Sequence, residues 1–383
     1  MNTTARSAAR PGWCVLVMVL LMLLTQPGWA ASSCGKPTPI DDGARLATAA
    51  ADTTIDVDAL CAAVLRLATP DVNLHGVVVE QHGLLQAEAY FDGTDHPNAS
   101  LWGRSASFTP HDLHDVRSVT KSVVALLTGI ALDQGRIASI DMPVLDHFPE
   151  HADLAATAKA RITLAHLLGM SSGLAWDESG SYLRPGNSET RMRFTLDPDR
   201  YVLDRDLADE PGSVFNYNGG GVALLGEVIA RATHKPLERY ADEVLFKPLD
   251  IRRTEWRRDR TGRVTPYGGL RLRPRDMARI GRLVLDRGRW NGRQLVSADW
   301  IVQMTRDRLP AGRLRYARLW WRGTVDADQA RHPYIAAFGN GGQRIFLVSD
   351  LDLVVVVTAG QYNQDTSWQA PLRVLQRVVE LAK

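Results

Sequence analysis

Ser118 and Lys121 are the residues whose types and spacing most directly suggest chemistry. They open a segment, 118–135, in which apolar residues recur at helical spacing. Residues three apart share one face of a helix, so the serine hydroxyl and the lysine amine can meet. Ser118 then lies at the positive end of the helix dipole, where a developing negative charge is stabilised. This is the arrangement of an activated nucleophile, although a serine that only caps a helix beside a solvated lysine has the same spacing.

The choice of lysine at position 121 favours the chemical interpretation. Only six of the 45 basic residues in this 383-residue sequence are lysines. A position that needs only positive charge would be served by arginine, which cannot give up its proton and so cannot act as a base. We expect burial and a second cation to lower the pKa of Lys121. Spacing alone does not decide the matter, because Ser33 and Lys36 share it.

Two glycine-rich segments follow downstream. The segment 211–226 carries Tyr217 and leads into a helical pattern at 222–233. The segment 337–343 comes directly before a strand pattern that begins at Arg344. Bare glycine lets a substrate approach the backbone closely. Taken alone, Tyr217 is more typical of a tyrosine packed in a loop than of a catalytic residue.

With these motifs the chain resembles the serine β-lactamase and penicillin-binding-protein family, in its class C β-lactamase, esterase and 6-aminohexanoate-oligomer hydrolase branch. Ser118-Val-Thr-Lys121 matches the family's S-x-x-K, Tyr217-Asn-Gly219 its Y-x-N, and Gly339-Asn-Gly341 its K-T-G or H-x-G triplet. The segments 162–174 and 267–277 are also similar to stretches typical of the family. The resemblance covers nearly the whole chain after its first residues.

The resemblance implies a fold and a set of roles. The fold is α/β, of the β-lactamase/transpeptidase type: an antiparallel sheet built from both termini and flanked by helices, with a mostly helical insertion. Ser118 would attack an acyl carbon, with Lys121 and Tyr217 relaying the proton. The backbone N–H groups of Ser118 and Gly342 would form the oxyanion hole.

Two departures from the family motifs bear on the substrate. Gly219 stands where many relatives have asparagine, and Gly339-Asn340 replaces the cation or histidine of the third motif. We therefore expect an uncharged short-chain ester, or an amide of a linear aliphatic acid, to be preferred over penicillins and cephalosporins. Arg344 is the residue that would restore a charge, although strand alternation places it on the face opposite Gln343. The expected substrate-binding residues, with Trp176 as an aromatic lid, are Trp176, Asn218, Asn340 and Gly341.

Three other patterns invite a functional reading that we reject. Gly169-Met-Ser-Ser-Gly173 spells G-x-S-x-G, the nucleophile elbow of α/β-hydrolases, but it follows a helical segment and not a strand, so we predict a helix C-cap and turn. The segment His111-Asp-Leu-His-Asp115 lacks a distant third ligand, so no metal site and no cofactor are expected. His166 is expected to be a buried, hydrogen-bonded histidine.

The remaining patterns place these motifs on elements. Helices are predicted at 55–67, 162–170 and 368–381, and a hairpin at 75–91 turns at His82-Gly83. Two nearly continuous apolar strands, 344–349 and 351–358, belong in the middle of a covered sheet. We expect a sheet subdomain at about 31–135 plus 259–383 and a helical subdomain at about 136–258, together forming a hydrolase domain over 31–383.

The N-terminal residues suggest export. A short apolar run, 13–24, follows Arg6 and Arg10 and precedes small residues, which predicts a signal peptide over residues 1–30. Its removal leaves Cys34 and Cys61 as the mature cysteines, and in an oxidising compartment they are expected to form a disulfide. Two unrelated buried thiols, or lipidation of Cys34, are the alternatives. We expect a periplasmic or secreted protein without membrane contact after removal of the signal.

The functional hypothesis is an exported, cofactor-free serine hydrolase that cleaves an ester or amide through an acyl-enzyme on Ser118. Its partner would be a small-molecule ester, amide or β-lactam, and its oligomeric state stays open. A net charge of +2 with scattered arginines gives no reason to expect nucleic-acid binding. Two alternatives remain: a true class C-type β-lactamase or D,D-carboxypeptidase, and a slowly deacylating penicillin-binding-type sensor or binding module.

Overall fold

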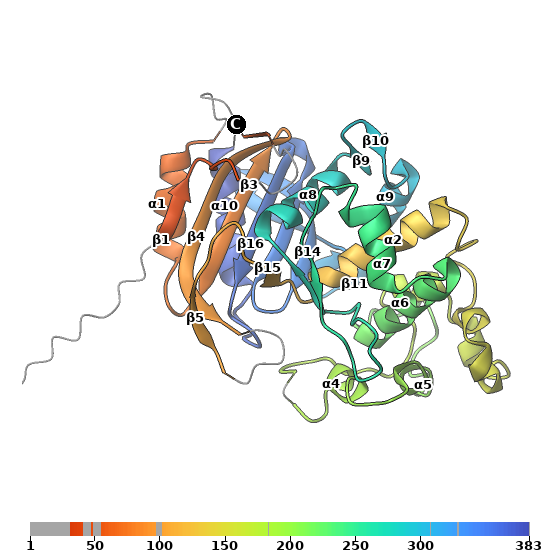
Figure 1. The fold of residues 1–383 in the computed structure, drawn as a ribbon. Coiled ribbons are helices and arrows are strands. Elements are labelled where there is room, and N and C mark those ends of the chain that lie inside the picture. The colour runs from red at the N-terminus through yellow and green to blue at the C-terminus, as the bar shows by residue number, and fades with distance from the viewer. Residues whose placement is uncertain are drawn as a thin grey trace, which may run out of the picture.

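A large antiparallel sheet dominates the computed structural model, which describes residues 31–40, 47–48, 55–96, 102–182, 184–306, 308–327 and 329–382. The predicted signal peptide, residues 1–30, lies outside the described residues. The strand order is β1-β4-β3-β16-β15-β14-β13-β12-β11, so strands from both ends of the described chain meet in the middle (Figure 1). This confirms the expected fold class, in which the two termini build one sheet.

The central strands carry the predicted apolar runs. The hairpin consists of β3 (Leu74–Gln81) and β4 (Leu84–Asp95), and its turn residues His82 and Gly83 both have positive φ, the conformation of a two-residue hairpin turn. Strand β16 (Leu353–Ala359) lies between β3 and β15 (Gln343–Val348) and is buried along its whole length. Valines fill both faces of β16 because helices cover both faces of the sheet.

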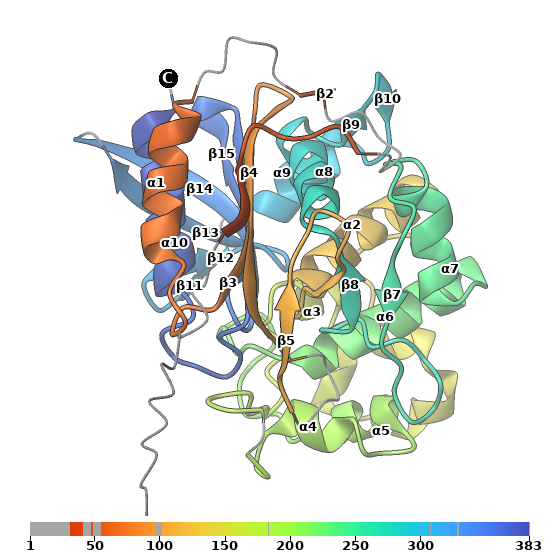
Figure 2. The ribbon, with the colours of Figure 1, turned by 60° about the vertical axis from the view of Figure 1, so that its left-hand side comes forward.

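Helices α1 (Val57–Leu67) and α10 (Gln369–Leu381) pack together on one face of the sheet, as Figure 2 shows. Their apolar side chains form one cluster with the odd-numbered valines of β3 and β16. A disulfide between Cys34 and Cys61 joins β1 (Ala31–Gly35) to α1, with a Cα–Cα distance of 5.8 Å. The predicted cysteine pairing is therefore present in the structure.

Helix α8 (Pro274–Leu285) covers the opposite face with buried arginines as well as apolar side chains. Arg275 contacts Glu88 of β4 and Arg282 contacts Glu80 of β3, with N–O distances of 2.6 and 2.8 Å. All four side chains are buried. Buried charges of this kind persist only when paired and hydrogen-bonded, so the arginines of α8 fix its position on the sheet.

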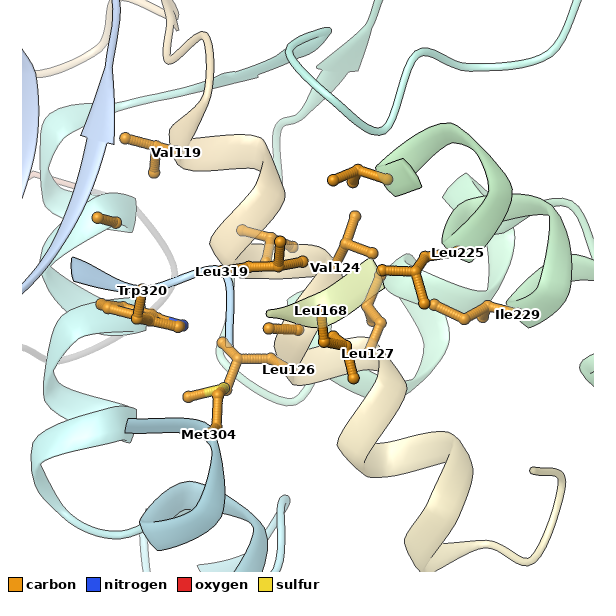
Figure 3. Close-up of a cluster of buried hydrophobic side chains, with 14 of the residues drawn as sticks. Val119, Val124, Leu126, Leu127, Leu168, Leu225, Ile229, Met304, Leu319 and Trp320 are labelled. Atoms are coloured by element: carbon orange, nitrogen blue, oxygen red, sulfur yellow. The ribbon is translucent and has the colours of Figure 1, made fainter. Parts of the chain in front are cut away.

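Helix α2 (Val119–Asp133) runs through the main apolar core, between the sheet and the helical part of the molecule. Its residues from Val119 to Ala131 are all buried. Figure 3 shows side chains of α2 packed against Leu168 of α3 (Leu164–Leu168), Leu225 of α6 (Gly219–Thr233) and Trp320. A helix packed on all sides is held rigidly, and so are the residues at its start.

The other elements are short. They are β2 (Ala47–Thr48), β5 (Arg104–Ser107), β6 (His114–Asp115), β7 (Glu255–Trp256), β8 (Leu270–Leu272), β9 (Arg289–Trp290), β10 (Arg293–Gln294), β11 (Leu309–Ala311), β12 (Leu314–Tyr316), β13 (Trp321–Ala327), β14 (Ala330–Gly339), α4 (Ser188–Met192), α5 (Pro198–Leu203), α7 (Leu237–Ala241), α9 (Ala298–Thr305), the 3₁₀ segments Val144–His147, Pro149–Leu154, Ala158–Arg161 and Ser349–Leu351, and a π-helical turn at Asp242–Phe246. Within the described ranges, no helix combines the length and the apolar character needed to cross a bilayer.

Candidate active site

Ser118 stands at the N-cap position of α2, immediately after a strained residue. Arg117 has a φ of +50°, a left-handed conformation that is uncommon for a residue with a side chain. Its guanidinium lies 4.3 Å from the ring centroid of Tyr362 and donates to the carbonyl oxygen of His96, and these contacts hold the conformation. Strain of this kind is concentrated at functional sites, and here it sets the direction in which Ser118 enters the helix.

Lys121 reaches Ser118 as the spacing predicts. Its Nζ donates to Ser118 Oγ at 3.0 Å and to the carbonyl oxygen of Tyr267 at 2.6 Å, and the side chain is 1 % exposed. Tyr217 comes from the loop before α6, and the Lys121 Nζ lies 4.9 Å from its ring centroid. Ser118 and Lys121 both lie close enough to the Tyr217 hydroxyl to lower its pKa, against the rise that burial causes. The three predicted catalytic residues therefore meet at one point.

The pKa of Lys121 is raised, which makes the expectation of a lowered value wrong. Burial lowers it, but Tyr217, Glu189 and Glu178 outweigh burial because their charges favour the ammonium form. The charged neighbours that shift the pKa of Lys121 are thus two carboxyl groups and a tyrosine, and not the second cation that we expected. Burial raises the pKa of Tyr217, with Lys121 opposing that shift. At neutral pH both side chains accordingly keep their protons.

The third motif lies beside the nucleophile. Gly339 ends β14, and a Cβ atom there would lie 2.3 Å from the carbonyl oxygen of Val116, so only glycine permits this approach. Gly341 and Gly342 follow with φ values of +90° and +100°. Glycines therefore allow the backbone between β14 and β15 to lie close to the segment that leads into Ser118.

Aromatic side chains that sequence reasoning missed line the Tyr217 side of the site. The Trp321 ring stacks with those of Tyr217 and Phe338, at centroid distances of 6.1 and 5.5 Å. Tyr316 packs edge-on against Trp321 at 4.7 Å, and Phe215 packs against Tyr316. These residues come from β12, β13, β14 and a loop, and only the fold brings them together.

Trp176 does not take the expected position of an aromatic lid. It is 7 % exposed and packs beneath the start of α6, where a Cβ atom on Gly220 would lie 2.6 Å from the indole ring. Its Nε1 donates to Glu178 Oε2 at 2.8 Å. The polar loop after Ser171 folds back into the core instead of over the substrate, because an indole ring gains more from burial there.

The two expected substrate-binding asparagines have structural partners. Asn218 is buried and caps α6, with its Oδ1 accepting from the Gly221 N–H at 2.9 Å. Asn340 makes two hydrogen bonds to Asn363, one through its Nδ2 and one through its Oδ1. The Oδ1 of Asn218, a residue that was expected to bind substrate, is thus used as a helix cap.

Arg344 does not restore a free charge. Its Nη1 donates to the carbonyl oxygens of Gly339 and Gln343 at 2.7 and 2.8 Å, and its guanidinium lies 4.5 Å from the Phe338 ring centroid. Burial lowers its pKa to about 10. The guanidinium is used to hold the turn between β14 and β15.

Ser171 ends a helix, as predicted. The Ser171 N–H donates to the His166 carbonyl oxygen, the Met170 N–H donates to that of Leu167, and Met170 has a φ of +53°. This pair of bonds around a left-handed residue is a Schellman motif, so the G-x-S-x-G pattern is a helix C-cap. His166 is half-buried, and its Nδ1 accepts from the Thr163 N–H in a capping box.

The histidine-rich segment before α2 is structural as well. His114 is buried, and Asp115 pairs with Arg271 at 3.4 Å. Burial lowers the pKa of His114 to about 3. Among the described residues, no group of three or more histidine, cysteine, aspartate or glutamate side chains is placed to hold a metal ion.

Comparison with known proteins places the chain in a family. The family model described as Beta-lactamase matches residues 77–376. The chain belongs to this family. It is therefore a β-lactamase-family serine hydrolase, and the matched range includes the three sequence motifs at 118–121, 217–219 and 339–341.

The relatives match stretches of different length in this β-lactamase-family chain. It is 27 % identical over 290 residues to a 6-aminohexanoate-dimer hydrolase from Paenarthrobacter ureafaciens, covering 68 % of this chain and 69 % of the relative. It is 34 % identical over 148 residues to esterase EstB from Burkholderia gladioli, covering 37 % of each. A crystal structure of a class C β-lactamase from Rhodobacter sphaeroides has the same fold, with a TM-score of 0.62, 18 % identity, and coverage of 84 % of this chain and 98 % of that one.

Proposed function

We propose that the protein is an exported serine hydrolase that cleaves an ester or an amide through an acyl-enzyme on Ser118. The observation that carries this proposal is the 3.0 Å contact between Lys121 Nζ and Ser118 Oγ at the start of a buried helix, with the Tyr217 ring centroid 4.9 Å from the same Nζ. A nucleophile held by a base, which is itself oriented by further groups, is the general form of such a site.

In the proposed acylation step, Ser118 Oγ forms a bond to the acyl carbon while its proton passes to the Lys121–Tyr217 pair. The bond from the acyl carbon to the leaving group then breaks, and the leaving alcohol or amine takes that proton. Water repeats the sequence on the acyl-enzyme and releases the acid. The backbone N–H groups of Ser118 and Gly342 are proposed to bind the oxyanion, a contribution commonly worth about 100-fold or more in rate per donor.

The substrate is proposed to be uncharged at the position facing the third motif. Asn340 is neutral and hydrogen-bonded to Asn363. The Arg344 guanidinium is hydrogen-bonded to two backbone carbonyls, so it is not free to bind a substrate carboxylate. The aromatic wall around Trp321 instead favours an apolar acyl group. The relatives described as an esterase and as a 6-aminohexanoate-dimer hydrolase support the same choice.

The substrate test compares specificity constants on one preparation for a short-acyl nitrophenyl ester, an aminohexanoate dimer and a chromogenic cephalosporin. We expect the ester or the dimer to exceed the cephalosporin by at least about tenfold, because a charge-assisted contact worth roughly 1.5–3 kcal/mol is missing for the latter. A cephalosporin that is the best of the three would replace this proposal with the class C β-lactamase alternative.

Export is part of the proposal and is supported by the disulfide between Cys34 and Cys61. Disulfides persist in secreted and periplasmic proteins and are rare where thiols are kept reduced. Mass mapping of the N-terminus of the mature protein, and of its cysteine peptides without reductant, tests this part. We expect a chain that begins after Ala30 and a linked cysteine pair.

A further inference from the structure

The position of Gly219, where the family motif has asparagine, is filled by two carboxyl groups from elsewhere in the chain. Gly219 is the first residue of α6. A Cβ atom there would lie 2.6 Å from Glu189 Oε2 and 3.0 Å from Glu178 Oε1. A side chain at 219 would therefore require these carboxyl groups to move, so glycine at 219 and the two glutamates form one arrangement.

Glu178 is held by three donors. The Gly219 N–H donates to its Oε2 at 2.5 Å, Trp176 Nε1 to the same oxygen at 2.8 Å, and the Tyr182 hydroxyl to Oε1 at 3.3 Å. One of these donors opens a 15-residue helix, whose positive end favours a negative group. The buried Trp176, which is no lid, thus orients a carboxyl group.

Glu189 connects this group to the catalytic lysine. It lies on the short helix α4, is 7 % exposed, and places Oε2 at 3.8 Å from Lys121 Nζ. The carboxyl groups of Glu178 and Glu189 are neighbours, since both face the position that a Cβ atom on Gly219 would take. Burial and the neighbouring Glu178 raise the pKa of Glu189 well above its usual range, with Lys121 opposing that shift.

We propose that the carboxyl groups of Glu178 and Glu189 together are the positioning group for Lys121, in the place that a side chain at residue 219 would otherwise take. This inference rests on the proposed function of Ser118. The pair opposes the burial cost of the ammonium and fixes Nζ between Ser118 and Tyr267. It also delays the loss of the Lys121 proton to higher pH, so it sets the pH at which the Lys121–Tyr217 pair becomes a base.

The charged and titratable groups around Glu189 come from five segments. Arg193 closes its own helix, and Tyr182 precedes it. The groups that face it from other elements are Lys121 on α2, Glu178 in the loop after Ser171, Tyr217 before α6 and Tyr267 before β8. Burial raises the pKa values of the three tyrosines. The change that a Glu189 variant makes in the pH profile is therefore expected to fall on Lys121.

The test measures the rate of Ser118 labelling by a fluorophosphonate as a function of pH. For Glu189→Gln we expect a loss of roughly tenfold or more at the optimum, because the lysine is less well placed. We also expect the acidic limb of the profile to move to lower pH by about one unit or more, because an opposite charge at this distance raises a lysine pKa by that amount. Glu189→Asp, which keeps a carboxyl group at this position, should move the limb less.

The matched control is Glu80→Gln. Glu80 is also buried and paired with a cation, Arg282, but it lies on β3 under α8. We expect a lower melting temperature and an unchanged pH limb. If Glu189 has only a structural role, Glu189→Gln should behave like this control. The labelling rate would then fall by the same factor at every pH, and the acidic limb would not move.

Two failures are distinguishable. If the wild-type protein is not labelled while fully folded by circular dichroism, the proposed function fails. If the wild-type protein is labelled and the limb is unmoved in Glu189→Gln, the inference is overturned and the function stands. Should Glu189→Gln fail to fold, Glu178→Gln decides in its place, since it removes the same charge pair from the other side and is expected to move the limb in the same direction.

Discussion

Ser118 and Ser171 invite direct comparison, because each follows a residue with a left-handed backbone. The φ values are +50° at Arg117 and +53° at Met170. Ser118 begins a helix of 15 residues, whereas Ser171 follows the end of a helix of five. A helix start offers unpaired N–H groups and a side chain one turn ahead, and a helix end offers neither to the serine that follows it.

The difference shows that the surroundings, and not the local motif, make a nucleophile. The Ser118 hydroxyl has Lys121 at 3.0 Å and Tyr217 beside it. Ser171 is 5 % exposed, and within the part of the chain that the structure describes no lysine or histidine nitrogen hydrogen-bonds to its hydroxyl. The sequence around Ser171 matches the nucleophile elbow of α/β-hydrolases, but its backbone forms the Schellman motif that ends a helix.

Removing each hydroxyl in turn is the strongest way to break this comparison. Ser118→Ala is expected to lower the turnover of a nitrophenyl ester by roughly 10⁴-fold or more, because the nucleophile and its bases act as one unit. Ser171→Ala serves as the matched control and should stay within about threefold of the wild-type rate, since it changes only a capped turn. An inactive Ser171→Ala beside an active Ser118→Ala would establish the elbow mechanism.

Changing the lysine tests whether Ser118 differs from Ser171 through a proton or only through a charge. Lys121→Arg keeps the cation but cannot release a proton, so we expect a loss of about 100-fold or more, close to that of Lys121→Ala. The wild-type rate should rise with pH above neutrality, because the neighbouring carboxyl groups and Tyr217 raise the pKa of Lys121 and the base form appears only as that proton leaves. An active arginine variant with the same pH profile would reduce Lys121 to an electrostatic role.

Removing the disulfide is expected to change the activity of the site least among these variants. It joins β1 to α1, on the face of the sheet away from α2. Replacing both Cys34 and Cys61 by serine should cost about 2 to 4 kcal/mol of unfolding free energy, given the 27-residue separation, and leave ester turnover nearly unchanged. Denaturant titration and the ester assay together check this, and a large loss of activity in a folded variant would connect that face to the site.

The sequence was sufficient for the elements that carry strong periodicity. The helix after Ser118, the hairpin at His82 and the buried strand β16 lie where the patterns predict, with boundaries shifted by a few residues. Capping explains two of the shifts at helix starts, since Asp56 and Ser118 are N-caps and not helical residues.

The parts of the site that no local pattern announces were missed. Glu178 and Glu189 are two glutamates of a polar segment, and only the missing side chain at Gly219 signals that something else occupies its place. Trp176 follows the Ser171 turn and was expected to be a lid, but its indole ring is buried. Long-range contacts of this kind depend on how loops pack, which periodicity does not encode.

The central claim is that Ser118, and not Ser171, is the reactive serine. The most direct measurement is intact-mass analysis after reaction with a fluorophosphonate, followed by peptide mapping of the adduct. We predict one adduct per chain, on the peptide that contains Ser118, and its absence from Ser118→Ala. An adduct on the peptide that contains Ser171, or an unlabelled protein that still hydrolyses the ester, would contradict the account.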